Sequence, residues 1–397
     1  LGLVVYGIIT VSARALGYSP ELFAMIQISG IAVLIDTITS SCWFLLRGFR
    51  NLLYESIGSI AAIIGMIAVG VFSIVTGLPV VALVYAVLFG SCVNLAIALF
   101  TLFGHARIPL ILKPDWQTMK YLAVISMPFA AAAIFSRVYT FIDVSILAKL
   151  AGEQAVGWYA AGNKLMLALN VIPGAIAASI YPALSAYSVS QKEKLSELTA
   201  RALFFLFLVA APLGVGIAVT APLIVPLFYG AAYMQTVAIL RLLAIGLLFG
   251  FCTFPLGSLL AATDHQKTNA VIFGVAALVN VAGNILLIPL FGAFGSAVAA
   301  TLTMATLFIF SVIATRSVLQ SRARSLLTRA FRILLCAGVM GTALWLLAKF
   351  DVGLGVVVFA GVVIYALCIV ATRVVTMRDV SEIHTSFSVH QWTKKAQ

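Results

Sequence analysis

The sequence predicts an all-α integral membrane protein, and two observations support this prediction. Of the 397 residues, 63% are hydrophobic and only 9% are charged, whereas soluble domains carry roughly 25% charged residues. The apolar residues form twelve runs, most of them near the roughly 20 residues that a helix needs to cross a bilayer. No segment shows the repeated ten-residue alternation of a β-barrel strand. Lipid is therefore the expected solvent for most of the chain.

The twelve predicted spans follow one another with short connectors that contain Gly, Pro and charged residues. The chain opens without Met inside a hydrophobic run, so the first span is short, and we expect that the true N-terminus is missing. The spans are 1–16, 22–46, 57–76, 79–103, 121–148, 156–187, 202–220, 236–262, 270–290, 294–315, 333–348 and 353–372.

The net charge of +12 is explained by membrane topology rather than by a nucleic-acid ligand. Alternate loops and the C-terminal tail hold 18 of the 24 Lys and Arg residues, while the opposite loops hold only Lys149 and Lys349. Basic residues accumulate in this way in cytoplasmic loops. We therefore expect a cytoplasmic C-terminus, a first helix that runs outward, and a basic tail after residue 373 that is attracted to membrane lipids.

An internal repeat at an offset of 215 residues predicts two parallel halves. Residues 60–64 (IAAII) match 275–279 (VAALV) in hydrophobic pattern, and in the same register Gly77 meets Gly292. Two halves in the same orientation are a known plan of transporters. The repeat places two further helices before residue 1, which would give fourteen spans in all. The predicted domains are a truncated N-lobe at 1–120, a C-lobe at 121–320, two extra spans at 321–375 and a cytoplasmic tail at 376–397.

Several sequence motifs, spread from about residue 20 to residue 375, are typical of a known protein family. They are Asp143 with Ile146-Leu147 and Gly152, then VGWYAAGNKL at 156–165, Pro173, YPALS at 181–185, LVN at 278–280, NILLIP at 284–289 and FGAFGSAVA at 291–299. With these motifs the chain resembles the polysaccharide (O-antigen type, Wzx-like) flippases of the multidrug/oligosaccharidyl-lipid/polysaccharide exporter superfamily.

The resemblance implies two six-helix lobes around a central cavity, two extra C-terminal helices and transport by alternating access. It implies a polyprenyl-pyrophosphate-linked oligosaccharide as cargo, in the bacterial inner membrane, for surface glycans such as lipopolysaccharide O-antigen or exopolysaccharide. A polysaccharide polymerase or the export machinery would then be a partner. The chain departs from the family at its front, where the first two spans are absent.

Six ionisable residues lie inside predicted spans, where a charge costs roughly 2.5–3.5 kcal/mol on insertion scales. Basic residues there would form a cavity for the anionic pyrophosphate, and a carboxylate would serve ion coupling; structural pairing and snorkelling are the alternatives. The candidates for cargo binding are Arg137, Lys164, Arg241 and Arg14, and the candidates for ion coupling are Asp143 and Asp36.

Depth within the span distinguishes these candidates. Arg137 lies twelve residues from the outer loop, about 18 Å deep by helical rise, which favours a cavity role over snorkelling. Asp143 and Lys164 lie at similar depths on neighbouring helices, so a structural Asp–Lys pair is predicted, which ion or cargo binding would break. Arg241 and Arg14 lie near the outer ends of their spans, where snorkelling is favoured.

Uncharged polar residues are placed on shared helix faces. Tyr139 is one turn from Asp143, and Asn163 shares a face with Asn170, as Asn280 does with Asn284. Hydrogen bonding between helices is the favoured interpretation of the asparagines. Four prolines each free a backbone carbonyl inside a span and permit a bend, namely Pro128, Pro173, Pro212 and Pro255.

Other chemistry finds no support in the sequence. It contains no P-loop, the four histidines have no ligand spacing, and the five cysteines lie in apolar runs as small hydrophobic residues do. We therefore expect a transporter and not an enzyme, without a cofactor or metal. A drug/cation antiporter or a peptidoglycan-precursor flippase of the same superfamily is the alternative. A membrane-embedded glycan polymerase or ligase is disfavoured because the outer loops are short.

Overall fold

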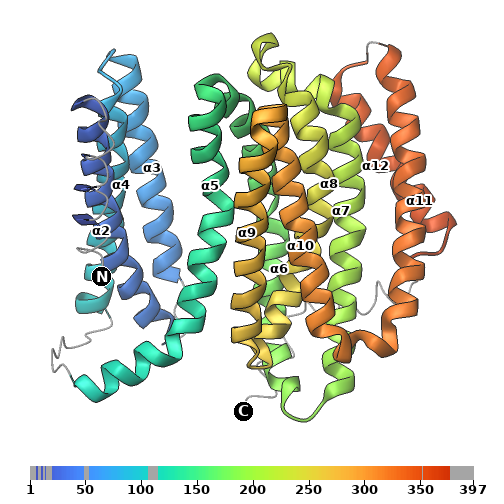
Figure 1. The fold of residues 1–397 in the computed structure, drawn as a ribbon, viewed down its shortest axis with the longest axis horizontal. Helices are drawn as coiled ribbons and strands as arrows, with labels where there is room; N and C mark the ends of the chain where they lie inside the picture. Colours follow the sequence, from blue (N-terminus) through green and yellow to red (C-terminus); the bar gives the residue numbers. More distant parts are fainter. Residues whose placement is uncertain are drawn as a thin grey trace. The chain divides into compact units, whose positions relative to one another are not determined.

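The computed structural model confirms the all-α membrane fold. It describes residues 20–48, 53–105, 115–350 and 352–375, with Tyr6, Gly7, Thr10, Val11 and Arg14 near the start. Within these ranges every regular element is a helix (Figure 1). Most of the predicted first span and the whole tail at 376–397 lie outside the described residues.

The helices from residue 20 onward agree in place with the predicted spans, and most extend beyond them by a few residues. The short elements are a π-helical turn η1 (Phe100–His105) and 3₁₀ turns η2 (Ala231–Tyr233), η3 (Gln320–Arg322) and η4 (Ala348–Phe350). The long helices are α2 (Pro20–Gly48), α3 (Leu53–Val75), α4 (Val81–Leu99), α5 (Trp116–Leu169), α6 (Val171–Ser188), α7 (Lys192–Tyr229), α8 (Thr236–Ala262), α9 (Gln266–Phe291), α10 (Ala293–Leu319), α11 (Ala323–Leu347) and α12 (Leu354–Ala371).

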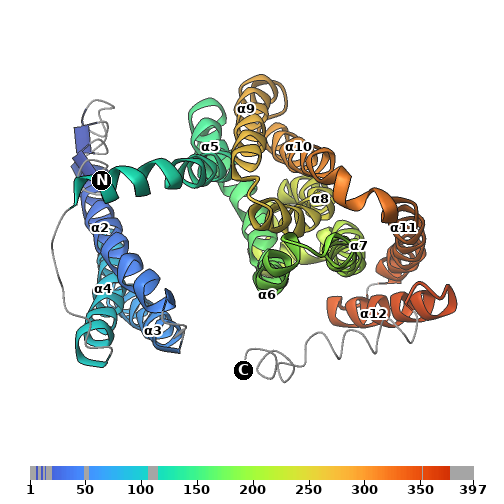
Figure 2. The same ribbon diagram turned by 90° about the horizontal axis from the view of Figure 1, so that it is seen from below.

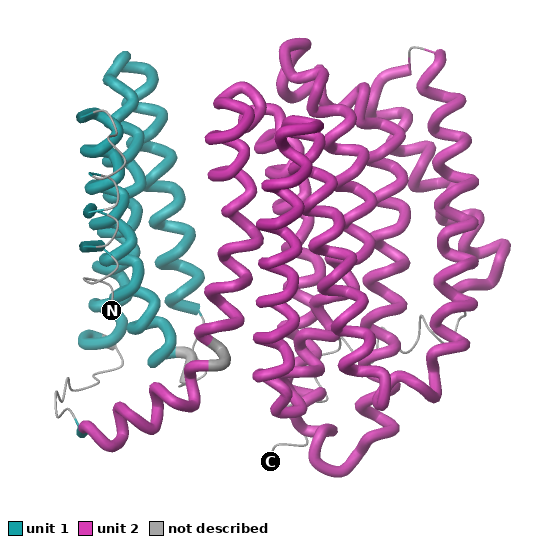
Figure 3. The backbone as a smooth tube through the Cα atoms, in the orientation of Figure 1, with its two compact units in different colours: residues 1–115 teal, residues 116–397 magenta. Residues whose placement is uncertain are grey.

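The chain divides into two compact units, at residues 1–115 and 116–397 (Figure 3). This division lies close to the predicted lobe boundary after residue 120. In the first unit, α2 and α3 pack against α4, and the Trp43 indole donates a hydrogen bond to Asn94 Oδ1 at 3.2 Å. The separate assignment of 321–375 stays a prediction, because α11 and α12 belong to the second unit by their contacts.

In the second unit, α8 lies at the centre of the helix bundle (Figure 2). It contacts α5, α6, α7 and α10, and half of the residues in its apolar centre are buried. Most other spans of this unit turn a large apolar surface outward, with Phe359 71% exposed on α12 and Leu290 72% exposed on α9. Such surfaces are stable only in contact with lipid or another protein.

Nine helical segments of the described chain are long and apolar enough to cross a membrane, whereas twelve spans were predicted. The difference arises because the helices of two pairs of predicted spans, within residues 130–188 and 293–350, are separated only by one non-helical residue or by a short 3₁₀ turn. The first pair is nevertheless a hairpin, since Gly152 has φ 82° and ψ 173°, a conformation that only glycine adopts freely. With the first span largely outside the described residues, the count of twelve stays a prediction.

The turn between α9 and α10, which contains Gly292, brings the two helices into close contact at Gly295. Gly292 has φ 56°, in the left-handed region, and ends α9. A Cβ at Gly295 would overlap the Leu287 carbonyl oxygen. No side chain fits at this position, so glycine sets the distance between the two helices.

Candidate functional site

A cavity of about 110 Å³, lined by both polar and apolar residues, lies in the second unit between α5, α8, α9 and α10. Its apolar lining comes mainly from α8, whose small Gly246 and Gly250 leave room for it. The volume holds a few water molecules or a hydrated ion, and it is too small for an oligosaccharide. Its polar lining consists of Tyr139, Thr140, Asp143, Tyr159, Asn163, Asn170, Asn280, Thr301 and Thr303.

The carboxylate of Asp143 is the one charged group among the described residues of this lining. Asp143 lies on the first arm of the α5 hairpin and is 2% exposed. Its Oδ2 accepts a hydrogen bond from the hydroxyl of Tyr159 on the second arm, and its Oδ1 accepts one from the backbone N–H of Val144 at 2.8 Å. An ionised carboxylate has about four acceptor positions, so these two bonds leave capacity for a ligand.

A second polar group reaches the cavity from α9 and α10. The side-chain amide of Asn284 donates to the backbone carbonyl of Asn280 at 2.8 Å and to its Oδ1 at 3.2 Å. The Ser296 hydroxyl, on α10, donates to Asn284 Oδ1 at 2.7 Å. These hydrogen bonds connect α10 to Asn280 on α9, which lines the cavity.

The side-chain nitrogen Nδ2 of Asn280 has no hydrogen-bond partner among the described residues, although Asn280 is only 1% exposed. A buried polar group without a partner costs about 1–3 kcal/mol. Because Asn280 lines the cavity, a water molecule or a ligand in that space can supply the missing bond.

Four of the predicted site residues meet at this cavity. Tyr139, Asp143, Asn163 and Asn280 all line it, and the Tyr139 ring stacks on Phe273 with the ring centroids 6.0 Å apart. Asn284 is fully buried directly behind them and forms hydrogen bonds between helices, as its helix face predicted. Whether these residues bind an ion or cargo stays a prediction.

The predicted ion pair between Asp143 and Lys164 is wrong. Asp143 is buried against Tyr159, whereas the Lys164 side chain is exposed, and no ion pair joins the two in the described structure. The reason lies in the hairpin geometry. Gly152 forms the turn, so Lys164 lies twelve residues beyond it while Asp143 lies nine before it, and Tyr159 at seven residues is nearer in depth.

The remaining charged candidates lie outside the cavity. The Arg137 side chain is exposed, with its guanidinium carbon 5.8 Å from the Phe141 ring centroid. Arg241 is exposed, and its Nε donates to the Ala218 carbonyl at 3.1 Å. In the first unit, Asp36 is exposed, and the guanidinium carbon of the exposed Arg14 lies 5.4 Å from the Phe23 ring centroid.

Sequence reasoning missed two residues that form hydrogen bonds with the predicted ones, Tyr159 with Asp143 and Ser296 with Asn284. Tyr159 was noted only as part of the VGWYAAGNKL motif. Its signal was available, because Tyr159 lies seven residues after Gly152 and Asp143 nine before it, so the two residues lie at similar depths in the hairpin. Ser296 gave no such signal, since its contact with Asn284 depends on the conformation of Gly292.

The fold is similar to that of solved transporters of the multidrug/oligosaccharidyl-lipid/polysaccharide exporter superfamily. It is similar to the lipid II flippase MurJ in its inward closed conformation, with a TM-score of 0.75 and 15% identity over 94% of this chain and 81% of that one. It is also similar to an inward-facing multidrug transporter of this superfamily, with a TM-score of 0.67 and 16% identity over 81% of this chain and 80% of that one.

The chain belongs to the family described as polysaccharide biosynthesis protein, whose model matches residues 1–238. It is 23% identical over 307 residues to a Haloferax volcanii protein named as a probable low-salt glycan biosynthesis flippase, Agl15. That match covers 77% of this chain and 63% of the relative, which is less than two thirds of the relative's length. A Shigella flexneri protein named as a putative O-antigen transporter is 25% identical over 158 residues, which is 40% of this chain and 37% of the relative. The names of these relatives agree with a transport protein rather than an enzyme.

Proposed function

We propose that this chain acts in a flippase that moves a polyprenyl-pyrophosphate-linked oligosaccharide across the bacterial inner membrane. Membership of the polysaccharide biosynthesis family and the similarity to a named glycan flippase support this cargo class. The fold is similar to both inward-facing and outward-facing structures of multidrug transporters, which supports transport by alternating access. In this proposal the C-terminus is cytoplasmic, and a glycan polymerase or the export machinery takes up the transported product.

The cavity at Asp143 is the proposed site of ion coupling. The observation that supports this proposal is the buried carboxylate of Asp143 in the lining of the cavity. A buried carboxylate must be neutralised by a proton or by a cation, because an uncompensated charge in a low-dielectric site is very costly. Carboxylate, amide and hydroxyl oxygens are all suitable ligands for a hard cation. Binding and release of a proton or cation there would then change the packing of α5 against α9 and α10. The exposed Asp36 in the first unit is a secondary candidate.

The cargo would bind outside the cavity, since about 110 Å³ cannot hold an oligosaccharide. Arg137 is the first candidate for contact with the pyrophosphate, because its guanidinium is exposed at a depth where lipid alone would not stabilise it. Arg14, Lys164 and Arg241 are further candidates, all with exposed side chains. Guanidinium groups bind phosphate oxygens in a bidentate manner.

One alternative cargo is a peptidoglycan precursor. The observation that favours it is the similarity to the lipid II flippase over 94% of this chain. The preference for basic over acidic residues within the predicted spans disfavours a cationic drug as cargo.

Complementation tests the cargo. The complete product of the gene is expressed in a flippase-null strain that carries the protein's own glycan pathway, and surface glycan is measured. We expect surface glycan to return, and we expect Arg137→Ala, at equal membrane abundance, to reduce it about tenfold or more. Accumulation of lipid-linked glycan on the cytoplasmic face despite normal expression would reject the oligosaccharide as cargo. Rescue of a strain that lacks its peptidoglycan-precursor flippase would then support the alternative.

The ion-coupling proposal needs a separate measurement. Asp143→Asn keeps the shape of the side chain and its ability to accept a bond from Tyr159, but it removes the titratable group. We expect this variant to insert normally and to lose transport that depends on an ion gradient. The matched control is Asp264→Asn in the exposed turn between α8 and α9, which should transport normally. Full transport by Asp143→Asn would exclude Asp143 as the coupling residue.

A further inference from the structure

Helix α7 carries three prolines within a single span, at Pro212, Pro222 and Pro226. Proline has no backbone N–H, so the carbonyl four residues earlier loses its helical hydrogen-bond donor. For the first two prolines these carbonyls belong to Leu208 and Ala218. In lipid no water is available to replace the missing donor, so each such carbonyl needs a partner from the protein.

Side chains of two other helices supply these donors. The hydroxyl of Tyr365, on α12, donates to the Leu208 carbonyl at 2.8 Å. The Nε of Arg241, on α8, donates to the Ala218 carbonyl at 3.1 Å. Each of these side chains therefore donates a hydrogen bond to a backbone carbonyl that has lost its helical donor because of a proline. The same arrangement, a side-chain donor on the carbonyl freed by a proline, occurs at Pro212 and again at Pro222. This repetition indicates that the contacts stabilise α7 where its prolines interrupt the helical hydrogen bonds.

Tyr365 also connects α7 to the C-terminal helices. Its half-buried side chain packs against a cluster that contains Ala211 and Ile333 and against a second one that contains Met340 and Val357. These clusters join α7, α11 and α12, which lie side by side in Figure 2. The hydroxyl of Tyr365 is a polar contact that binds α12 directly to the backbone of α7.

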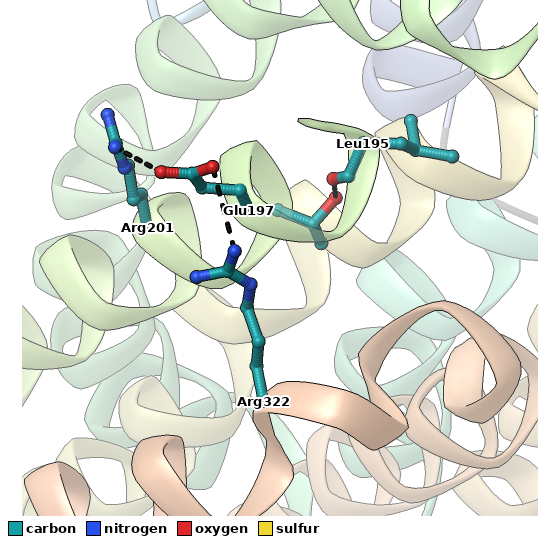
Figure 4. A network of polar contacts seen from close by, with 5 residues as sticks. Leu195, Glu197, Arg201 and Arg322 are labelled. Atoms are coloured by element: carbon teal, nitrogen blue, oxygen red, sulfur yellow. Dashed lines mark hydrogen bonds and ion pairs between the residues drawn. The ribbon is translucent and has the colours of Figure 1, made fainter. Parts of the chain in front are cut away.

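A second connection lies near the start of α7. The carboxylate of Glu197 pairs with Arg201 on the same helix and with Arg322 in η3, the latter at 3.6 Å (Figure 4). Arg322 directly precedes α11, so the carboxylate holds the beginning of α11 against α7. The helix pair α11–α12 is therefore attached to α7 both near its start and at the Pro212 break.

We propose that Tyr365 is a positioning residue of the transport cycle, which closes the break at Pro212 and makes α7 move together with α11 and α12 as one body. The donor comes from outside α7, so the break can open only when α12 separates from α7. This inference rests on the proposed function for its role in transport. The contact between Tyr365 and the Pro212 break stands on the geometry alone.

A double-mutant cycle between Tyr365→Phe and Pro212→Ala tests the contact. Tyr365→Phe removes only the hydroxyl, and Pro212→Ala restores a backbone N–H that can bond to the Leu208 carbonyl. Hydrogen exchange of α7 amides near residues 205–216 is measured by mass spectrometry on the full protein in nanodiscs. With Pro212 present, we expect Tyr365→Phe to accelerate exchange by about tenfold. In the Pro212→Ala background, the same change should have no effect.

Equal acceleration in both backgrounds, or none in either, would overturn the assignment. Pro212→Leu serves as a second background that also restores the N–H. Tyr85→Phe on α4, where the tyrosine is 53% exposed, is the matched control and should leave exchange in α7 unchanged. Exchange does not depend on cargo, so a failure of the proposed function would leave this result intact. Transport by Tyr365→Phe should fall and should recover in the double variant with Pro212→Ala; loss of transport without recovery would reject the positioning role.

Discussion

The hydroxyl of Tyr159 donates a hydrogen bond to the carboxylate of Asp143 from the opposite arm of the α5 hairpin, and both side chains are at most 2% exposed. This contact fixes the one charged group that the described residues bring to the cavity in the second unit. It also leaves part of the carboxylate directed toward the cavity, where Asn280 on α9 contributes an amide nitrogen without a partner among the described residues.

Removal of this hydroxyl should weaken both the fold and transport. In Tyr159→Phe the carboxylate loses its side-chain donor, and an unsatisfied buried group costs about 1–3 kcal/mol. We expect thermal unfolding in detergent to shift down by several degrees and transport to fall about tenfold at equal expression. Tyr181→Phe, on the exposed surface of α6, is the control. An unchanged melting temperature would show that the Tyr159 hydroxyl does not support the buried carboxylate.

The two asparagines of α9 should respond differently to mutation. Asn284 bonds to Asn280 and Ser296, so Asn284→Ala leaves two partners unsatisfied and should lower the free energy of unfolding by about 1–3 kcal/mol. Asn280→Ala removes an amide that already lacks one partner, so its stability cost should be smaller. Thermal unfolding and transport are measured for both. We expect Asn280→Ala to reduce transport more than stability, and the reverse order would assign Asn280 a structural role.

Close packing at the turn between α9 and α10 makes Gly295→Ala a severe change. Its Cβ would overlap the Leu287 carbonyl oxygen, and a backbone atom cannot move aside as a flexible side chain does. Overpacking costs about 1–3 kcal/mol and occasionally more, so we expect poor folding or low yield of monodisperse protein. Gly338→Ala on α11 meets no atom within 4 Å and should be tolerated. Size-exclusion profiles of the two variants test this contrast.

Arg241 has a structural contact that competes with its proposed role in cargo binding. Arg241→Met removes the donor to the Ala218 carbonyl, and because lipid offers no water to replace it, we expect a loss of stability of about 1–3 kcal/mol. In a Pro222→Ala background the loss should disappear, because residue 222 then supplies an N–H. Thermal unfolding of the four proteins measures this. A variant as stable as the parent but inactive in transport would instead make Arg241 a cargo-binding residue.

The fold could be predicted from the sequence because span length and charge bias act locally. Each apolar run is long enough to form its own helix, and α8 begins and ends at the predicted residues, 236 and 262. The reversal at Gly152 lies between the spans predicted at 121–148 and 156–187, but the φ of 82° that makes it possible could not be predicted. Local hydropathy contains no information on that dihedral angle.

The site was predicted in part, and the reason is again physical. Helix periodicity identified Asn280 and Asn284 as neighbours on one face, and both are buried at the site. Depth along a span gave the wrong partner for Asp143, because depth alone does not state which face of the helix is turned inward. The exposed Lys164 shows this, since it lies on the same arm as Tyr159 but points elsewhere.

The position of Gly152 has a consequence for the biogenesis of the protein. Asp143 and Tyr159 are only sixteen residues apart, so their hydrogen bond needs one hairpin and none of the later helices. A nascent chain that leaves the translocon with these two arms can mask its carboxylate before α9 and α10 have been synthesised. We expect Tyr159→Phe to lower the membrane-integration efficiency of this hairpin in a glycosylation-mapping assay. Tyr159, which lines the cavity in the mature protein, would thus also lower the free-energy cost of inserting the Asp143 carboxylate into the membrane.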